Sequence, residues 1–131
     1  MSLLRRRMMM GIGDEGLPIG IDLAEVYGVQ VGAMLDGNGV ADGWAPGVAS
    51  NFIPCKSDYL FELKTTANTW NKVCFYDENM SFISSNSLGT YGVGIFQFGK
   101  GTPYGTPETV KYLMAQLKGQ SENRYYIKRI A

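Results

Sequence analysis

Apolar and polar residues alternate most clearly in the middle of the chain. In DYLFEL (residues 58–63) every second side chain, Tyr59, Phe61 and Leu63, is large and apolar, which is the period-two pattern of a half-buried β-strand. A second strand is predicted in WNKVCFYD (residues 70–77), where large side chains fall on both faces. Large side chains on both faces are typical of a strand inside a sandwich.

Weaker forms of the same pattern predict further strands on either side. They fall at residues 29–35, 80–83, 91–98 and 125–130. Two segments are ambiguous. IDLAEVYG (residues 21–28) fits either one or two helical turns or an edge strand, and TVKYLMAQL (residues 109–117) has apolar positions at helical spacing but fits a strand equally well.

Glycine supplies 17 of the 131 residues, which is nearly twice its usual share and favours many turns over long helices. The predicted strands are short and are separated by Gly-rich turns, as in sandwiches and jelly rolls. We therefore predict an all-β fold, a jelly-roll-like antiparallel β-sandwich of about seven to nine strands. Residues 21–131 form this domain in our prediction, and residues 1–20 form an N-terminal arm and linker.

The first ten residues, MSLLRRRMMM, place three arginines before a short apolar run. The run stops at GIGDEG, far short of the apolar length that a signal peptide or a membrane span needs. We expect no signal peptide and no membrane insertion. Two interpretations of the arm remain open: a short basic helix that contacts a neighbouring subunit, or a flexible tail.

Charge argues against a nucleic-acid partner. Lys plus Arg and Asp plus Glu number twelve each, and without the three consecutive arginines the remainder has nine basic and twelve acidic residues. A mildly acidic body lacks the clustered positive charge that phosphate contacts require. We expect no DNA or RNA partner.

Composition also argues against catalysis and metal binding. The chain has no His, the commonest general base and metal ligand. Cys55 and Cys74 lack the spacing of a zinc site, and two buried free thiols are favoured over a disulfide. Asp77 and Glu78 are adjacent in a predicted turn, so they cannot face one glycosidic bond as a hydrolase pair must. We predict no enzyme activity, no catalytic residue, no cofactor and no metal.

The best candidate for ligand binding is Trp44. It lies in DGNGVADGWAPGVAS (residues 36–50), which we predict to be a long loop because it is longer than a hairpin turn and poor in bulky apolar residues. Sugars present apolar C–H faces that stack on exposed aromatic rings. The alternative is that Trp44 folds back onto the core.

Four weaker candidates for the same kind of site are Asp42, Trp70, Tyr91 and Tyr104. Trp70 fits a core position better, and the two tyrosines fit packing beside Gly-rich turns slightly better than binding. Asp42 shares its loop with Asp36 and Asn38, but their spacing matches no calcium loop, so a solvated turn is favoured.

Four segments in order carry a resemblance: SNFIPC (residues 50–55), DYLFEL (residues 58–63), WNKVCFYDENMSFISS (residues 70–85) and TPETVKYLMAQL (residues 106–117). Their order resembles a β-sandwich module of tail, baseplate and fibre-like proteins from phages and prophages of gut Firmicutes. The opening MSLLRRRMMM is also similar to the start of small proteins from such prophage regions. The resemblance covers residues 29–131, and its motifs are structural rather than catalytic. It implies a strand introduced by Thr-Pro at residues 109–117 and a galactose-binding-like or carbohydrate-binding-module-like jelly roll.

The resemblance therefore implies a non-catalytic carbohydrate-binding or adhesion module of a phage tail or fibre-like structure. The expected partners are a cell-surface or dietary glycan and further copies of the chain, since several copies would let weak sites add by avidity. The expected location is a phage-like particle made in the bacterial cytoplasm. The alternative is a structural or assembly protein that oligomerises through its N-terminal arm and binds no ligand.

Overall fold

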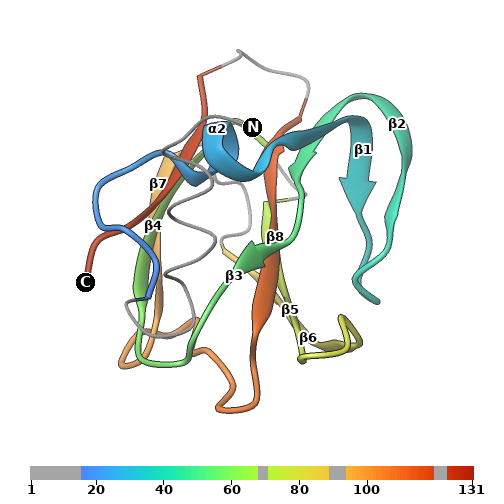
Figure 1. Ribbon diagram of the computed structural model, residues 1–131. Helices are drawn as coiled ribbons and strands as arrows, with labels where there is room; N and C mark the ends of the chain where they lie inside the picture. The colour runs from blue at the N-terminus through green and yellow to red at the C-terminus, as the bar shows by residue number, and fades with distance from the viewer. Residues whose placement is uncertain (1–15, 68–70, 89–93, 120–123) are drawn as a thin grey trace.

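The computed structural model describes residues 16–67, 71–88, 94–119 and 124–131, and it confirms the predicted all-β sandwich (Figure 1). Within these residues the chain forms one short helix and nine strands. In chain order they are α2 (Leu23–Tyr27), β1 (Val29–Leu35), β2 (Ala41–Ser50), β3 (Ile53–Pro54), β4 (Leu60–Thr65), β5 (Lys72–Tyr76), β6 (Phe82–Ser87), β7 (Gly94–Gly99), β8 (Tyr112–Lys118) and β9 (Tyr126–Arg129). All pairings between these strands are antiparallel.

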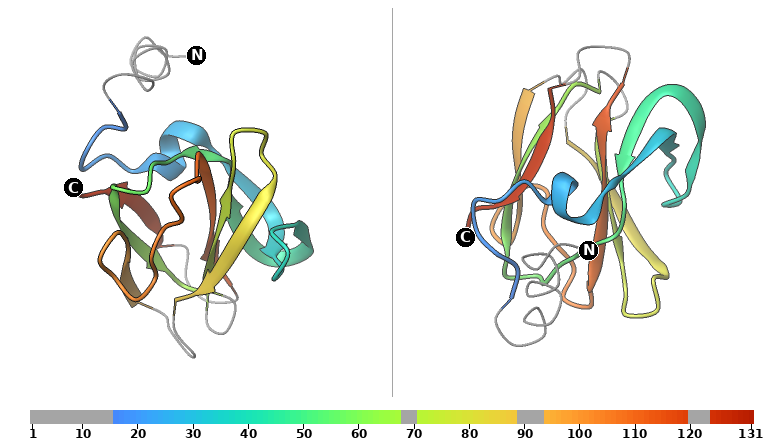
Figure 2. Two further views of the ribbon diagram at one scale, coloured as in Figure 1. Left: turned by 90° about the horizontal axis from the view of Figure 1, so that it is seen from below. Right: turned by 45° about the horizontal axis from the view of Figure 1, so that its top comes forward.

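The strands form two sheets that face each other (Figure 2). The larger sheet has the order β1-β2-β8-β5-β6, with β3 also paired to β8, and the smaller sheet has the order β7-β4-β9. Phe61 and Phe98 of the smaller sheet stack with ring centroids 5.1 Å apart, and Phe75 of the larger sheet packs on Phe98 at 6.2 Å. Together with Leu113 and Ile127 these side chains belong to a fully buried core between the sheets.

The structure assigns a secondary structure to both segments whose pattern was ambiguous, residues 21–28 and 109–117. Residues 112–118 form strand β8, as predicted, and most of its side chains are buried on both faces, which removes the polar alternation that marks a half-buried strand. Residues 23–27 form helix α2, which Asp22 caps by accepting a hydrogen bond from the Ala24 amide at 3.1 Å. Asp22 also accepts from the Ile127 amide at 3.2 Å, so the cap ties the helix to β9.

The prediction of a loop over residues 36–50 is wrong beyond the turn. Residues 41–50 form β2, the longest of the described strands, which pairs with β1 at residues 41–43 and 48–50, on either side of an irregularity in the register. Close packing requires a small residue at Gly47, because a Cβ atom there would lie 2.3 Å from the Ala33 carbonyl oxygen and 2.8 Å from the Trp44 ring. The low apolar content of this segment therefore belongs to a strand of a hairpin rather than to a loop.

The β1–β2 hairpin curls over the outer face of the larger sheet (Figures 1 and 2). Leu35 of the hairpin packs with Cys74 and Met114 in a second buried cluster, separate from the core between the sheets. Tyr76 donates a hydrogen bond of 2.6 Å from its hydroxyl to the Gly39 carbonyl at the tip of the hairpin. The larger sheet is therefore covered on both faces, which explains why β5 has large side chains on each.

A buried glutamine joins the hairpin to the sheet. The side-chain amide of Gln116 donates to the carbonyls of Ala33, Val48 and Lys118 at 2.9 to 3.2 Å. Its oxygen accepts from the Leu35 amide at 2.8 Å. These bonds satisfy backbone groups where the pairing of β2 with β8 shifts register between Val48 and Ala49.

The part of the predicted linker that the structure describes packs against the sandwich. Leu17 is buried, its amide donates to the Tyr59 hydroxyl at 3.3 Å, and its carbonyl accepts from the Arg129 guanidinium. The guanidinium also lies 3.7 Å from the centre of the Tyr59 ring. The arm predicted at residues 1–10 lies outside the described residues, and the domain boundary at residue 20 stays a prediction.

Candidate functional site

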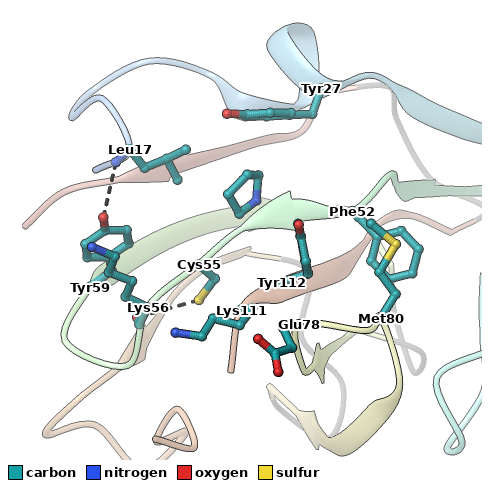
Figure 3. Close-up of a pocket in the computed structure, with 11 residues that line it drawn as sticks. Leu17, Tyr27, Phe52, Cys55, Lys56, Tyr59, Glu78, Met80, Lys111 and Tyr112 are labelled. Atoms are coloured by element: carbon teal, nitrogen blue, oxygen red, sulfur yellow. Dashed lines mark hydrogen bonds between the residues drawn. The ribbon is translucent and has the colours of Figure 1, made fainter. Parts of the chain in front are cut away.

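A groove of about 560 Å³ runs past β3 on the side of the sandwich where α2, the turn after β5 and the start of β8 converge (Figure 3). A volume of this size is within the range of small-ligand sites. The groove connects the rim of the second buried cluster to the rim of the core between the sheets, because its lining residues pack against both.

Aromatic and apolar side chains form one end of the groove. Phe52 and Tyr112 are half-buried and meet edge to face with ring centroids 6.0 Å apart. Phe52 also packs edge to face against Tyr76, with ring centroids 4.8 Å apart. Met80 is 48% exposed and also lines the groove, and Figure 3 draws its side chain at the same end as Phe52. This end offers preformed apolar faces, since the rings are fixed by one another.

The other end is bounded by buried and charged residues. Leu17, Cys55 and Tyr59 line it and belong to the core between the sheets, so they form its closed floor. Lys56 and Lys111 are exposed, and both line this part of the groove. Figure 3 shows both lysine side chains on the Cys55 side, away from Phe52 and Met80.

The Cys55 thiol is not placed for chemistry. Burial raises its pKa well above the ordinary value, and the charge of Asp58 raises it further. Cys74 behaves similarly, since burial raises its pKa to about 11. Both are free, as predicted. At neutral pH these thiols are protonated and therefore poor nucleophiles.

The turn that carries Met80 has an unusual backbone. Asp77 accepts hydrogen bonds from the Asn79 and Ser81 amides at 2.8 and 3.0 Å, which closes a five-residue turn. Met80 has φ of +62°, the one positive φ outside glycine among the described residues. This conformation costs a non-glycine residue about 1 kcal/mol, and it directs a flexible apolar side chain to the groove.

The structure does not bring the predicted binding residues together in this groove. Trp44 is half-buried on β2 beside Gly47, and Asp42 is exposed on the same strand opposite Met34. Tyr104 is half-buried in the loop after β7, where its hydroxyl donates to the Leu88 carbonyl at 2.9 Å. Trp70 and Tyr91 lie outside the described residues.

The sequence pattern did not lead to a prediction of this groove, although one short segment of alternating residues contributes to its lining. In SNFIPC and the following lysine, Phe52, Pro54 and Lys56 alternate with Ile53 and Cys55. Ile53 and Cys55 are buried, so the alternate residues face outward, and each of the three lines the groove. The pattern predicted an apolar entry to the next strand rather than an aromatic surface, because its partners Tyr112 and Met80 are distant in sequence.

The described residues contain no group of three or more His, Cys, Asp or Glu side chains arranged to hold a metal ion. No helix in the same part of the chain has the length and hydropathy to cross a membrane. No protein-family model matches the chain, and no curated protein or solved structure shows significant similarity to it.

Proposed function

We propose that this protein is a non-catalytic carbohydrate-binding module and that the groove beside β3 is its binding site. One observation carries the proposal: preformed aromatic faces of Phe52 and Tyr112 stand next to free polar groups in a groove of about 560 Å³. Sugars combine apolar C–H faces with a ring of hydroxyl groups, and they are bound by this combination of surfaces.

The polar groups of the groove are suited to hydrogen bonding with hydroxyl groups. The Tyr112 hydroxyl and the ammonium groups of Lys56 and Lys111 form no hydrogen bond or ion pair within the described residues. Glu78 supplies a carboxylate on the same lining. A single carboxylate with buried, protonated thiols offers no acid and base pair for hydrolysis, which supports binding without catalysis.

The setting that we propose is a phage tail or fibre-like structure that displays several copies of the domain to a cell-surface or dietary glycan. A shallow site of this size binds weakly, and multivalent display raises the overall affinity without new contacts. This setting rests on the resemblance of four segments, in their order along the chain, to modules of phage tail and fibre-like proteins.

A glycan-array screen with the protein held on a multivalent support tests the proposal. We expect binding to a defined class of glycan and a loss of at least about tenfold in the Tyr112→Ala variant. Trp44→Ala is the matched control, since it removes an aromatic ring outside the groove, and it should bind like the wild type. Thermal unfolding of both variants separates loss of binding from loss of fold.

Two outcomes would contradict the proposal in different ways. Loss of binding in Trp44→Ala but not in Tyr112→Ala would place the site on the β1–β2 hairpin, as the sequence pattern predicted. No binding by folded, densely loaded wild type would favour the alternative, a structural protein that assembles through its N-terminal arm.

A further inference from the structure

The charge of the groove is unevenly distributed. Lys56 and Lys111 are far apart in sequence, but the Cys55 amide donates to the Lys111 carbonyl at 2.9 Å, which sets the two lysine-bearing segments side by side. Both side chains are exposed, and neither forms an ion pair or a hydrogen bond within the described residues. Two unpaired positive charges thus share one end of the groove.

The rest of the lining offsets one of these two positive charges. Glu78 is the single acidic side chain among the residues that line the groove, so the lining has one positive charge in excess. Figure 3 shows the Glu78 carboxylate between Lys111 and Met80, and the side chains of Phe52 and Met80 at the end away from Lys56. The groove therefore pairs an apolar, aromatic end with a cationic end.

We infer that the ligand is an acidic sugar, specifically a uronic acid within a glycan chain, with its carboxylate at Lys56 and Lys111 and its ring over Tyr112. This inference rests on the proposed function and deepens it by naming the substrate class. A carboxylate fits because its single negative charge matches the excess of the lining, and ammonium groups form charge-assisted hydrogen bonds with it. Lysine recognises charge rather than a planar geometry, which suits sugar carboxylates in several orientations.

The test uses matched pairs of ligands. Oligosaccharides of galacturonate, glucuronate and mannuronate are compared with the same chains after reduction of each carboxylate to an alcohol. We expect at least one acidic chain to bind at least about tenfold more tightly than its reduced counterpart. Its affinity should fall as NaCl is raised from low to physiological concentration, because exposed charges are screened.

Charge-removing variants locate the effect in the groove. Lys56→Gln with Lys111→Gln should lose the preference for the acidic chain and keep any affinity for the reduced chain. Lys64→Gln with Lys100→Gln removes the same charge outside the groove and should behave like the wild type. Glu78→Gln should bind the acidic chain several-fold more tightly, because it removes a like charge from the site.

The outcomes separate this inference from the proposed function. Equal binding of acidic and reduced chains, or an acidic preference that survives loss of both groove lysines, would overturn the inference and leave a carbohydrate-binding groove. Binding of no sugar by folded wild type would overturn both. Sulfated chains serve as a further arm, and binding to them alone would contradict the assignment of a carboxylate.

Discussion

The two faces of the larger sheet are covered in different ways. The inner face packs on the smaller sheet through large apolar side chains such as Phe75, Leu113 and Phe98. The outer face is covered by the β1–β2 hairpin, whose contacts combine a small apolar cluster with the hydrogen bonds of Gln116 and Tyr76. The inner face is held mainly by apolar burial, whereas the outer face also depends on satisfied polar groups.

This difference explains where the groove lies. The hairpin does not cover Phe52 and Tyr112, which pack against the rim of the outer cluster and stay half-buried. On the inner face Phe61, Phe75 and Phe98 are fully buried between the two sheets. A partial cover therefore leaves a groove that a complete sandwich would bury.

The largest expected effect comes from the inner face. Phe75→Ala removes a fully buried ring that packs on Phe98, and we expect the free energy of unfolding to fall by about 3–5 kcal/mol. Urea unfolding followed by fluorescence measures the change. A loss below about 1 kcal/mol would mean that the inner face is not the principal core.

A substitution on the outer face should lower the free energy of unfolding by a smaller amount. Gln116→Leu keeps the approximate volume but leaves the Leu35 amide and the carbonyls of Ala33 and Val48 without their partner. We expect a loss of about 2–3 kcal/mol. Hydrogen exchange gives a sharper test, since the Leu35 amide should exchange faster while the Leu63 amide in β4 stays protected. Equal acceleration at both sites would show that the two faces unfold as one unit.

The two hairpin turns provide a matched pair. The turn at residues 36–40 repeats the hydrogen bonds of the turn at residues 77–81, and its fourth residue, Gly39, has φ of +78° where the other turn has Met80 at +62°. We expect Met80→Gly to stabilise the fold by about 0.5 kcal/mol, because relief of backbone strain exceeds the added freedom of the unfolded chain.

In the other turn, replacing glycine by a residue with a side chain should destabilise the fold. A Cβ atom on Gly39 would lie 2.4 Å from the Phe82 ring and 2.9 Å from the Tyr76 hydroxyl, so Gly39→Ala should cost about 1–3 kcal/mol. Thermal unfolding of both variants measures the contrast. Destabilisation by Met80→Gly would mean that the Met80 side chain contributes more through its contacts than its backbone costs.

The smallest effect concerns pH. The amides of Val40 and Asn38 donate to the Asp36 carboxylate and hold its pKa below the ordinary value of 3.8. A pKa that is lower in the folded state contributes stability above the unfolded value, and this stability is lost as pH falls through the folded value. Asp36→Asn should therefore be less stable than the wild type at neutral pH, with a difference that shrinks below about pH 4. Unfolding measured from pH 7 to pH 2 checks this, and a difference independent of pH would contradict it.

The local pattern of the chain determined most of the strands. Alternation at Tyr59, Phe61 and Leu63 predicted β4, and large residues on both faces of residues 70–77 predicted a strand enclosed on two sides. These predictions succeed because side chains of a strand alternate between faces whatever the rest of the fold does. The same reasoning failed for β2, since most of its residues are small, as in a loop, although the strand pairs with β1.

Only the tertiary structure decided the groove that we propose as the binding site. Phe52 precedes β3, Met80 follows β5 and Tyr112 begins β8, so no short window of sequence contains them. They meet because β8 lies between β3 and β5 in the larger sheet. Strand order and the partial cover of the hairpin are set by contacts between distant residues, whereas an alternating pattern reports only which face of a strand is buried. The sequence alone could therefore determine an all-β fold, while the groove and its two lysines required the packed sheets.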